Sequence, residues 1–490
     1  MHLSSLPGPH GIGTMGKAAR EFVDFLQQAG QTYWQLLPVC PTGYGDSPYQ
    51  SFSTFAGNPY FIDLDLLAEE GLLERSEYED IDWECRPDAV NYSALYRKRF
   101  PVLRLAAERL LYRSQDDYLR FCMENRHWLG DYALFMTLKE VYGGMAWQQW
   151  PAELRERSRH AMEEVRLRYC KEVAFWQVTQ YLFYRQWNDL RQYAAAKGVR
   201  FIGALPIYVS LDSADVWAHR ELFRLDGEGF PTEVAGCPPD GFSADGQLWG
   251  YPLFDWERMA QDDYAWWVSR IDFQCRVYDR LRIDHFRGFD SYFAIPFGDE
   301  NARRGVWCKG PGMALFRAVE RQIGRRDIIA EDLGYLTDSV RRLLEESGFP
   351  GMKVLEFGFD RREPDHEVYL PHNYPRHCVA YVGTHDNDTA QGWMAGADPV
   401  DVAHAREYLS LNSEEGYHWG MMRALWASVA DLAVVQAQDL LGLGSESRMN
   451  TPGSMGGNWC WRALPGSFTA KMAWRMRRQM ALYGRLPQNG

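Results

Sequence analysis

The stretch AAREFVDFLQQAGQTYWQLL, residues 18–37, carries the alternation from which the fold is predicted. Phe22, Phe25 and Leu26 recur at a spacing that places them on one face of a helix, and a glycine then provides a stop. Residues 32–37 follow as an aromatic and aliphatic run that is typical of a strand. A helix that leads into such a strand predicts βα units and a parallel sheet.

Strand-like runs recur along the chain and extend this pattern to seven strands. An eighth would have to come from Met1–Leu3, ahead of a Ser-Ser-Leu-Pro-Gly turn, and would be clipped short. We therefore predict an α/β fold, a (β/α)8 TIM barrel, with another arrangement of the N-terminus at its closure. A doubly wound open sheet is the alternative, because it does not need the eighth strand. The further strands are expected at 201–207, 281–286, 327–330, 353–357, 378–383 and 431–436.

The region between the first two strands is predicted to be mostly helical. Trp176, Phe183 and Trp187 recur there as one buried stripe, and Gly198 ends the pattern. The helices are too many for a simple crossover between strands, which indicates an inserted subdomain. The expected organisation is a first part of the barrel at 1–68, a mostly helical insertion at 69–198, and the remainder of the barrel with substrate-binding loops around its mouth at 199–490.

Composition narrows the classes of function. A net charge of −13 opposes binding to nucleic acid and to anionic membranes, so a neutral substrate is expected. The sequence has neither a basic and apolar leader nor an apolar run of about 18 residues, which predicts a cytoplasmic protein. The nine cysteines are scattered singly and are expected to be reduced core thiols. A reactive thiol is the alternative for Cys308, which is predicted to lie in a loop beside Trp307.

Three of the predicted strands end in acidic clusters. They are RIDHFRG at 282–288, IAEDLG at 329–334 and GTHDNDT at 383–389. In each, an apolar run gives way abruptly to charge, as expected where a buried strand emerges into a polar site. Because a barrel gathers the C-terminal ends of its strands around one mouth, we expect the three clusters to converge there.

Paired carboxylates suit glycosidic-bond chemistry. One carboxylate attacks or stabilises an oxocarbenium-like carbon, while the other stays protonated and donates to the leaving oxygen. Arg282 lies two residues before Asp284 and would point to the same side of its strand, where it could hold that carboxylate ionised. Asp284 is therefore the better candidate for the nucleophile.

Two other interpretations of these clusters stay open. An acidic residue at a strand end is commonly a helix N-cap rather than a catalytic group. A metal site is also compatible with the pattern, because His285, His385, Asp386 and Asp388 are ligand types that would lie near one another in a closed barrel. The sequence contains no tightly spaced His or Cys pair there that would favour the metal.

Turn-rich segments that carry aromatic side chains are candidate sugar-binding loops. Residues 236–252 combine turn formers with Phe242, Trp249 and Tyr251. Tyr49 follows the first strand and would lie over the same mouth. Aromatic rings can cover the apolar faces of a sugar, which makes these residues candidate glucose contacts. The alternative for Trp249 is that it packs onto the barrel rim as part of the core.

With these residues assembled, the chain resembles the amylomaltase or 4-α-glucanotransferase family of the α-amylase clan over nearly its whole length. The resemblance implies that Asp284 is the nucleophile, Glu331 the general acid and base, and Asp386 the stabiliser of the transition state. The matching stretches are 5–8, 11–13, 47–50, 58–60, 238–252, 282–288, 330–334, 384–389, 448–453 and 457–459.

The resemblance also implies partners and substrate contacts. Malto-oligosaccharides and glucans derived from starch or glycogen are the expected substrates, with no organic cofactor, no catalytic metal, no nucleic acid and no membrane. The expected reaction is a double displacement with net retention, for which the two carboxyl groups should lie about 5–5.5 Å apart. The implied substrate-binding residues are Arg282, His385, Tyr49, Ser47, Gln247, Trp249 and Asn387.

The chain departs from the family pattern at the third strand, where Ala204 stands in place of the usual aspartate. One supporting carboxylate is thereby lost, which would lower activity if that group normally orders the nucleophile. Two alternatives to the transferase follow: a hydrolytic α-glucosidase or amylase that uses the same carboxylates, and a catalytically weakened protein that only binds glucans.

Overall fold

A computed structural model describes residues 1–43, 45–113, 115–239, 245–334, 336–362, 365–454 and 456–487. Among these residues, seven parallel strands form the two hydrogen-bonded groups β1-β2-β5-β8 and β9-β10-β11. The strands are β1 (Tyr33–Gln35), β2 (Arg200–Leu205), β5 (Arg280–Ile283), β8 (Ile328–Ala330), β9 (Gly351–Val354), β10 (Cys378–Tyr381) and β11 (Leu432–Val434). Each overlaps a predicted strand, so the seven strands expected from the sequence are confirmed.

The two groups of strands join and close into a barrel. The Ala330 N–H donates to the Pro350 carbonyl over 3.0 Å, which connects β8 with the start of β9. The Tyr381 hydroxyl on β10 donates to Gln35 Oε1 on β1 over 3.0 Å, so strands from the two ends of the order meet. The strands therefore follow one another in chain order without a switch point, which confirms the barrel and rules out the doubly wound sheet.

The N-terminal residues lie beside β1, where the eighth strand was expected. Leu3–Ser5 forms a 3-10 helix instead of a strand. The Met1 carbonyl accepts a hydrogen bond from Trp34 Nε1 over 2.7 Å, and the Ser5 carbonyl accepts one from the Ala463 N–H over 2.9 Å. The N-terminal segment is thus held between the first strand and a segment from the far end of the sequence.

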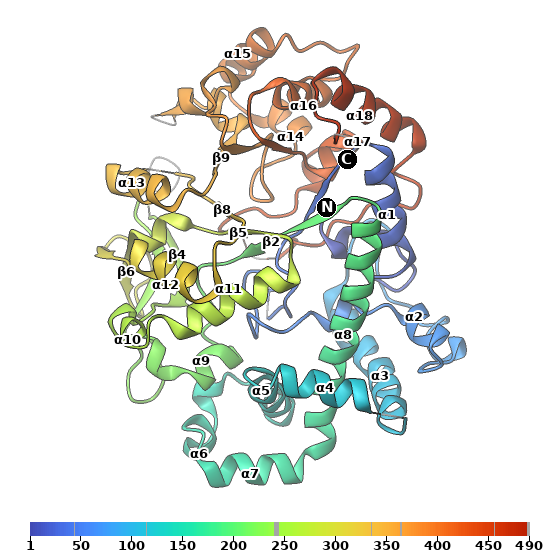
Figure 1. Cartoon of the computed structure of the whole chain (residues 1–490), viewed down its shortest axis with the longest axis vertical. Coiled ribbons are helices and arrows are strands. Elements are labelled where there is room, and N and C mark those ends of the chain that lie inside the picture. Colours follow the sequence, from blue (N-terminus) through green and yellow to red (C-terminus); the bar gives the residue numbers. More distant parts are fainter. Residues whose placement is uncertain are drawn as a thin grey trace.

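Helices surround the barrel and extend from it (Figure 1). Helices α3 to α7 gather at one end of the molecule, below the long α8, and α14 to α18 lie at the opposite end. The helices are α1 (Lys17–Gln28), α2 (Leu64–Glu69), α3 (Tyr92–Leu111), α4 (Asp116–Glu124), α5 (Leu129–Val141), α6 (Ala152–Arg155), α7 (Arg159–Arg168), α8 (Cys170–Ala196), α9 (Ala214–Ala218), α10 (Trp256–Gln261), α11 (Ala265–Val277), α12 (Met313–Ile323), α13 (Asp338–Ser347), α14 (Ala390–Gly396), α15 (Pro399–Leu409), α16 (Tyr417–Ala427), α17 (Ala437–Leu441) and α18 (Ala470–Leu482).

The predicted helical faces agree with the observed burial. Phe22, Phe25 and Leu26 of α1 are buried, and so are Trp176 and Trp187 of α8. Through these side chains, the apolar stripe of each helix packs against the main core. The helical character of the region between β1 and β2 is therefore as expected, while the division of the chain at 69 and 198 stays a prediction.

A separate antiparallel sheet replaces two segments that were expected to be loops. Its strands are β3 (Glu233–Cys237), β4 (Gln247–Pro252), β6 (Ser291–Pro296) and β7 (Val306–Lys309), in the order β4-β3-β6-β7. The prediction of a loop was wrong for residues 236–237 and 247–252, which lie on β3 and β4, and Cys308 lies on β7 rather than in a loop. Turn-forming residues hid these strands: Gly236 is needed because a Cβ there would come within 2.1 Å of the Gln247 carbonyl oxygen.

Side chains that point into the barrel form a small core of their own. It joins residues from β2, β8, β9 and β10 and fills part of the barrel interior: Ile202, Ile329, Met352, Val354, Val379 and Tyr381. In the part of the chain that the structure describes, no helix combines the length and the apolar character needed to span a membrane.

Candidate active site

Adjacent strands place Asp284 and Glu331 side by side. Asp284 follows β5 and Glu331 follows β8, and these strands pair in register with Ile283 opposite Ala330. The Glu331 N–H donates to the Ile283 carbonyl over 3.0 Å, which extends the ladder to the acidic residues themselves. The predicted convergence of the first two acidic clusters is therefore present at the C-terminal ends of the strands.

Arg282 contacts both carboxyl groups. Its side chain is only 3% exposed, and Nη2 lies 3.2 Å from Asp284 Oδ1 and 2.5 Å from Glu331 Oε2. Glu331 Oε2 also accepts a hydrogen bond from the His285 backbone N–H over 3.2 Å. The guanidinium thus contacts Asp284 as the sequence predicted, but it lies closer to Glu331, so the expectation that it holds Asp284 ionised is not met in the free site.

The difference between the two distances from Arg282 influences which carboxyl group is more readily protonated when no substrate is bound. Burial raises the pKa of Asp284 well above its usual range, and the nearby Glu331 charge raises it further against the opposing effect of Arg282. Burial alone would also raise the pKa of Glu331, but Arg282 and a hydrogen bond from Asp284 outweigh it and lower that pKa to about 2. The closer contact of Arg282 with Glu331 therefore favours the charged form of Glu331 and a shared proton on the Asp284 side of the pair.

Asp386 lies in the segment after β10 and is held by residues far away in the sequence. Its Oδ1 accepts a hydrogen bond from Asn450 Nδ2, and its backbone carbonyl accepts one from Arg448 Nη2, both over 2.6 Å. His385 Nε2 lies 3.4 Å from Asp386 Oδ2. The Asp386 side chain is 46% exposed, so its carboxylate remains available to the mouth of the barrel.

Aromatic and electrostatic contacts connect Asp386 with the carboxyl pair. The Tyr49 ring stacks on His385 with centroids 5.0 Å apart, and Tyr49 Oη lies 3.5 Å from Arg282 Nη1. The Asp386 charge also contributes to the raised pKa of Asp284. The three acidic residues named from the sequence thus act on one another across a single site, with Tyr49, Arg282 and His385 between them.

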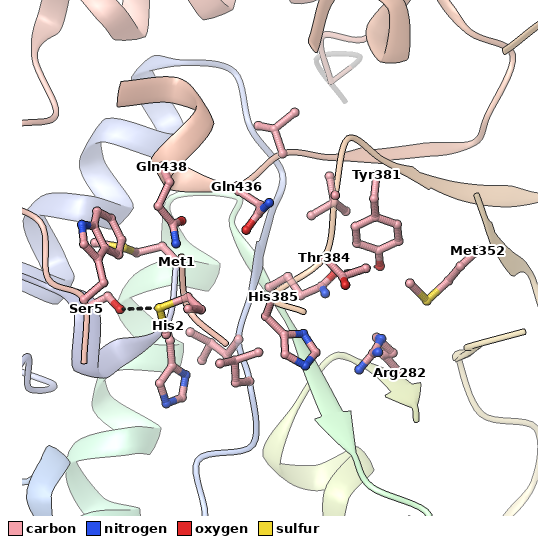
Figure 2. A pocket seen from close by; sticks show the side chains of 18 residues that line it. Met1, His2, Ser5, Arg282, Met352, Tyr381, Thr384, His385, Gln436 and Gln438 are labelled. Atoms are coloured by element: carbon pink, nitrogen blue, oxygen red, sulfur yellow. Dashed lines mark hydrogen bonds between the residues drawn. The ribbon is translucent and has the colours of Figure 1, made fainter. Parts of the chain in front are cut away.

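A cavity of about 70 Å³ lies behind this site, inside the barrel (Figure 2). Arg282, Thr384 and His385 line one side of it, and Met1 and Gln436 line the other, where the N-terminal residues lie near β11. Asp284, Glu331 and Asp386 are not among its lining residues. The carboxyl groups therefore face the mouth of the barrel, while Arg282 and His385 separate them from the inner cavity.

The predicted substrate-binding residues on the antiparallel sheet approach the site from one side. Trp249 on β4 meets the His285 ring edge to face, with centroids 4.9 Å apart, and its Nε1 donates to Gln247 Oε1 over 3.0 Å. Trp249 also packs partly against the main core, so its core interpretation holds in part, and its contact with sugar stays a prediction. Phe242 lies outside the described residues.

Ser47 and Asn387 are used within their own turns. Ser47 Oγ accepts a hydrogen bond from the Tyr49 N–H over 3.2 Å. Asn387 Oδ1 accepts bonds from the N–H and the hydroxyl of Thr384, each over 2.9 Å. These contacts shape the two segments beside the site, and a direct contact of either residue with substrate stays a prediction.

Sequence reasoning assigned no role to Arg448 or Asn450, although both lie in a stretch that was singled out. No spacing rule connects them with Asp386, because they approach it through the tertiary fold. For the metal interpretation, the described residues contain no group of three His, Cys, Asp or Glu side chains placed to hold an ion. The N-cap interpretation fails for Asp386, since Thr389 caps the following helix α14.

Comparison with known proteins gives a consistent result. Residues 1–467 match the sequence profile of a family described as 4-alpha-glucanotransferase. The chain is 45% identical over 489 residues to a 4-alpha-glucanotransferase of Clostridium butyricum, which covers 99% of this chain and 100% of that protein. It is 46% identical over 488 residues to a 4-alpha-glucanotransferase of Thermus thermophilus, covering 97% and 96% of the two chains.

A solved structure agrees with these sequence relatives. The structure of amylomaltase from Streptococcus agalactiae in complex with acarbose superimposes with a TM-score of 0.96. The two proteins are 41% identical, and the match covers 99% of each chain. The likeness therefore extends over the barrel, the helical region and the antiparallel sheet together.

Proposed function

The chain belongs to the 4-alpha-glucanotransferase family, and we propose that it transfers α-1,4-glucan segments between malto-oligosaccharides through the carboxyl pair Asp284 and Glu331. The observation that supports this assignment most directly is the contact of both carboxyl groups with one buried guanidinium, Arg282. Such a pair can divide the roles of nucleophile and acid, which a glycosidic bond requires.

In the proposed first step, Asp284 attacks the anomeric carbon of the donor while Glu331 protonates the leaving oxygen. A covalent glucosyl intermediate forms on Asp284, and the shortened glucan leaves. Glu331 then removes the proton from the 4-hydroxyl of an incoming glucan, which attacks the intermediate and releases Asp284. Two inversions at the same carbon give net retention, and the carboxyl separation of about 5–5.5 Å remains a prediction.

The proton must change its position within the pair before this step can occur. In the unoccupied site the contact of Arg282 with Glu331 favours the proton on Asp284, whereas the attack needs it on Glu331. A neutral sugar that fills the mouth displaces water from both carboxyl groups and offers Glu331 the glycosidic oxygen as a partner. We propose that donor binding drives this transfer over the short distance between the two groups, so that Arg282 then stabilises the ionised Asp284.

Asp386 is proposed to stabilise the positive charge that develops on the sugar ring. Its carboxylate is fixed by Asn450 and lies next to His385. A carboxylate that is oriented before the reaction stabilises an oxocarbenium-like transition state more than it stabilises the neutral substrate. Arg282, His385 and Tyr49 would border the reacting glucose.

Transfer rather than hydrolysis requires that a sugar occupies the acceptor position in place of water. Trp249 and Tyr251 lie on β4 beside His285, and the Tyr251 hydroxyl donates to the Tyr49 carbonyl over 3.4 Å. This links the aromatic strand with the segment after β1. We propose that these rings hold the acceptor glucan close to the intermediate and exclude water.

Incubation with maltotriose tests the function. A transferase converts it into glucose and a ladder of longer malto-oligosaccharides, which thin-layer or high-performance chromatography resolves. A hydrolytic α-glucosidase or amylase gives only shorter products, and a protein that merely binds glucans gives none. A digest without longer products would exclude the transferase.

A further inference from the structure

The segment that carries Asp386 is enclosed by two buried acids that have no part in the proposed chemistry. It follows β10, whose neighbours in the sheet are β9 and β11. Glu356 lies just after β9 in the 3-10 helix Leu355–Phe359, and Asp439 lies after β11 in α17. Their exposed fractions are 2% and 0%. Each neighbouring strand therefore delivers one solvent-free carboxyl group to the Asp386 segment.

Glu356 supports the beginning of this segment. A Cβ on Gly383 would lie 3.0 Å from both Glu356 Oε1 and the Cβ of Asn387, so these two side chains fill the space beside the glycine. The Asn387 amide donates a hydrogen bond to the Glu356 carboxyl. Thr384 Oγ1 donates to Asn387 Oδ1 over 2.9 Å and accepts from the Asp386 N–H over 3.3 Å. A continuous series of contacts thus runs from Glu356 to the backbone of Asp386.

Asp439 supports the end of the same segment. Its Oδ1 accepts a hydrogen bond from the Ala390 N–H, the first residue of α14, over 2.7 Å. Among the described residues, Asp439 Oδ2 and Glu356 Oε1 have no hydrogen-bond partner. Each acid thus uses its contacts on this segment and leaves one oxygen in a dry environment, where a full charge is costly.

The surrounding charges favour the uncharged forms of both acids. Burial, Asp439 and Asp388 raise the pKa of Glu356 well above its usual range, against the opposing effects of Arg448 and the Asn387 amide. Burial raises the pKa of Asp439 to about 7, and Asp388 contributes to this rise while the Ala390 N–H opposes it. Both carboxyl groups therefore hold a proton more readily than an exposed acid does.

We propose that Glu356 and Asp439 are positioning residues that fix residues 383–390 from both sides and so keep the Asp386 carboxylate directed at the reacting sugar. The inference rests on the proposed function, because it assigns these residues an effect on turnover through Asp386. Neither acid touches the substrate. Each supports the segment best in its uncharged form, because an ionised carboxylate would repel Asp388 within the same enclosure.

The test measures kcat and KM for glucose release from maltotriose, together with Tm, in the full-length variants E356A, E356Q, D439A and D439N. Misplacement of a catalytic group by about 1 Å can cost roughly 100-fold in rate. The alanine variants should therefore lose at least about tenfold in kcat while KM changes by less than about threefold. The amide variants imitate the protonated acids and should retain at least about one third of kcat.

Asn387 provides a check of the proposed series of contacts. N387A should lower kcat about as much as E356A, and the double variant should be no slower than either single variant, because both remove the same connection. Folded alanine variants with unchanged kcat, amide variants as slow as the alanine variants, or additive losses in the double variant would each overturn the proposal.

The pH dependence keeps the test decisive if the alanine variants do not fold. Asp439 ionises as the pH passes about 7, so kcat of the unmodified protein should fall relative to that of D439N between about pH 6 and about pH 8. A constant ratio across this range would contradict the proposal. The substitution D284N separates the two hypotheses: full activity in D284N would remove the proposed function whatever the variants at 356 and 439 show.

Discussion

Two pairs of acidic side chains lie at strand ends of the same barrel. They differ in whether a cation contacts them. Asp284 and Glu331 share contact with Arg282 and face the mouth. Glu356 and Asp439 are enclosed on either side of the neighbouring segment and form no ion pair among the described residues. The contrast appears in the pKa values, because that of Glu331 falls to about 2 whereas that of Asp439 rises to about 7.

The difference shows that burial alone does not make an acid catalytic. Glu356 and Asp439 are fully enclosed, and Asp284 and Glu331 are mostly shielded, with side chains 26% and 18% exposed; this loss of hydration by itself favours the protonated form. Direct contact with the Arg282 guanidinium reverses this preference for Glu331. The neighbouring Asp284 still favours the protonated form. Where no cation makes contact, burial favours the uncharged form of the acids, and they support the structure. The presence of a shared buried cation therefore distinguishes the reacting pair from the supporting pair.

The largest expected effect comes from removing the charge of the nucleophile. D284N should lower kcat by at least about 10⁴-fold, because an amide cannot form the covalent intermediate. Glucose release from maltotriose measures the loss. The matched control is D279N at the opposite end of β5, where Asp279 Oδ2 accepts a hydrogen bond from the Phe201 N–H. That variant should lose stability and keep kcat; unchanged turnover in D284N would exclude Asp284 as nucleophile.

Removing the shared cation should have the next largest effect. R282Q leaves two adjacent carboxyl groups without their counter-ion, so kcat should fall by roughly 10²–10³-fold, comparable to the loss of one preorganised donor in an enzyme site. The pH profile of kcat/KM should change as well, since the two acids would titrate without the asymmetry. R280Q is the control, because Arg280 pairs with Asp327 over 2.7 Å two residues earlier on the same strand. Equal losses in both variants would show that Arg282 acts through stability alone.

Substitution of Asp439, a member of the supporting pair, should change the stability of the folded protein. The pKa of Asp439 is raised in the folded protein, so folding takes up a proton between about pH 4 and about pH 7, and stability falls as the pH rises through that window. D439N removes this dependence. Its free energy of unfolding relative to the unmodified protein should increase from pH 4 to pH 7, by a change on the order of 4 kcal/mol. Urea unfolding at several pH values measures it, and parallel curves would show that Asp439 is ionised throughout.

The smallest effect is expected from a substitution at Ala204, which tests how Arg282 acts on Glu331. Ala204 on β2 is the register partner of Arg282 on β5 and is 4% exposed, so a carboxylate at 204 would compete with Glu331 for the guanidinium. A204D should raise the pKa of Glu331 and shift the alkaline limb of kcat/KM to higher pH, with a rate change of less than about tenfold. A204N has the same shape without the charge. A shift of equal size in A204N would attribute the effect to packing instead.

Local patterns were sufficient to predict the barrel strands and the three acidic residues. Three strands of the barrel are short apolar runs followed by charge, and parallel strands bring their C-terminal ends to one edge, so the convergence of Asp284, Glu331 and Asp386 follows from chain order. The family resemblance then supplied their roles. The fold class and the family are confirmed, while the individual roles remain proposals for experiment.

Features that depend on contacts between distant segments could not be predicted. Arg448 and Asn450 reach Asp386 from more than 60 positions away in the sequence. The antiparallel sheet was missed because Gly236 and its neighbours have the composition of a turn, although tertiary packing against β4 requires the glycine in a strand. The protonation of the carboxyl pair depends on the difference between two distances to Arg282, which no sequence pattern contains.

The contact between the N-terminal segment and Ala463 has a consequence for biosynthesis. Ser5 finds that partner only after more than nine tenths of the polypeptide has left the ribosome, which takes on the order of a minute at ordinary rates of elongation. Until then the N-terminal segment beside β1 lacks its contact with the segment around Ala463, and apolar surface stays exposed to other nascent chains. Slow translation, low temperature or a chaperone that shields the first segment should therefore raise the yield of native protein.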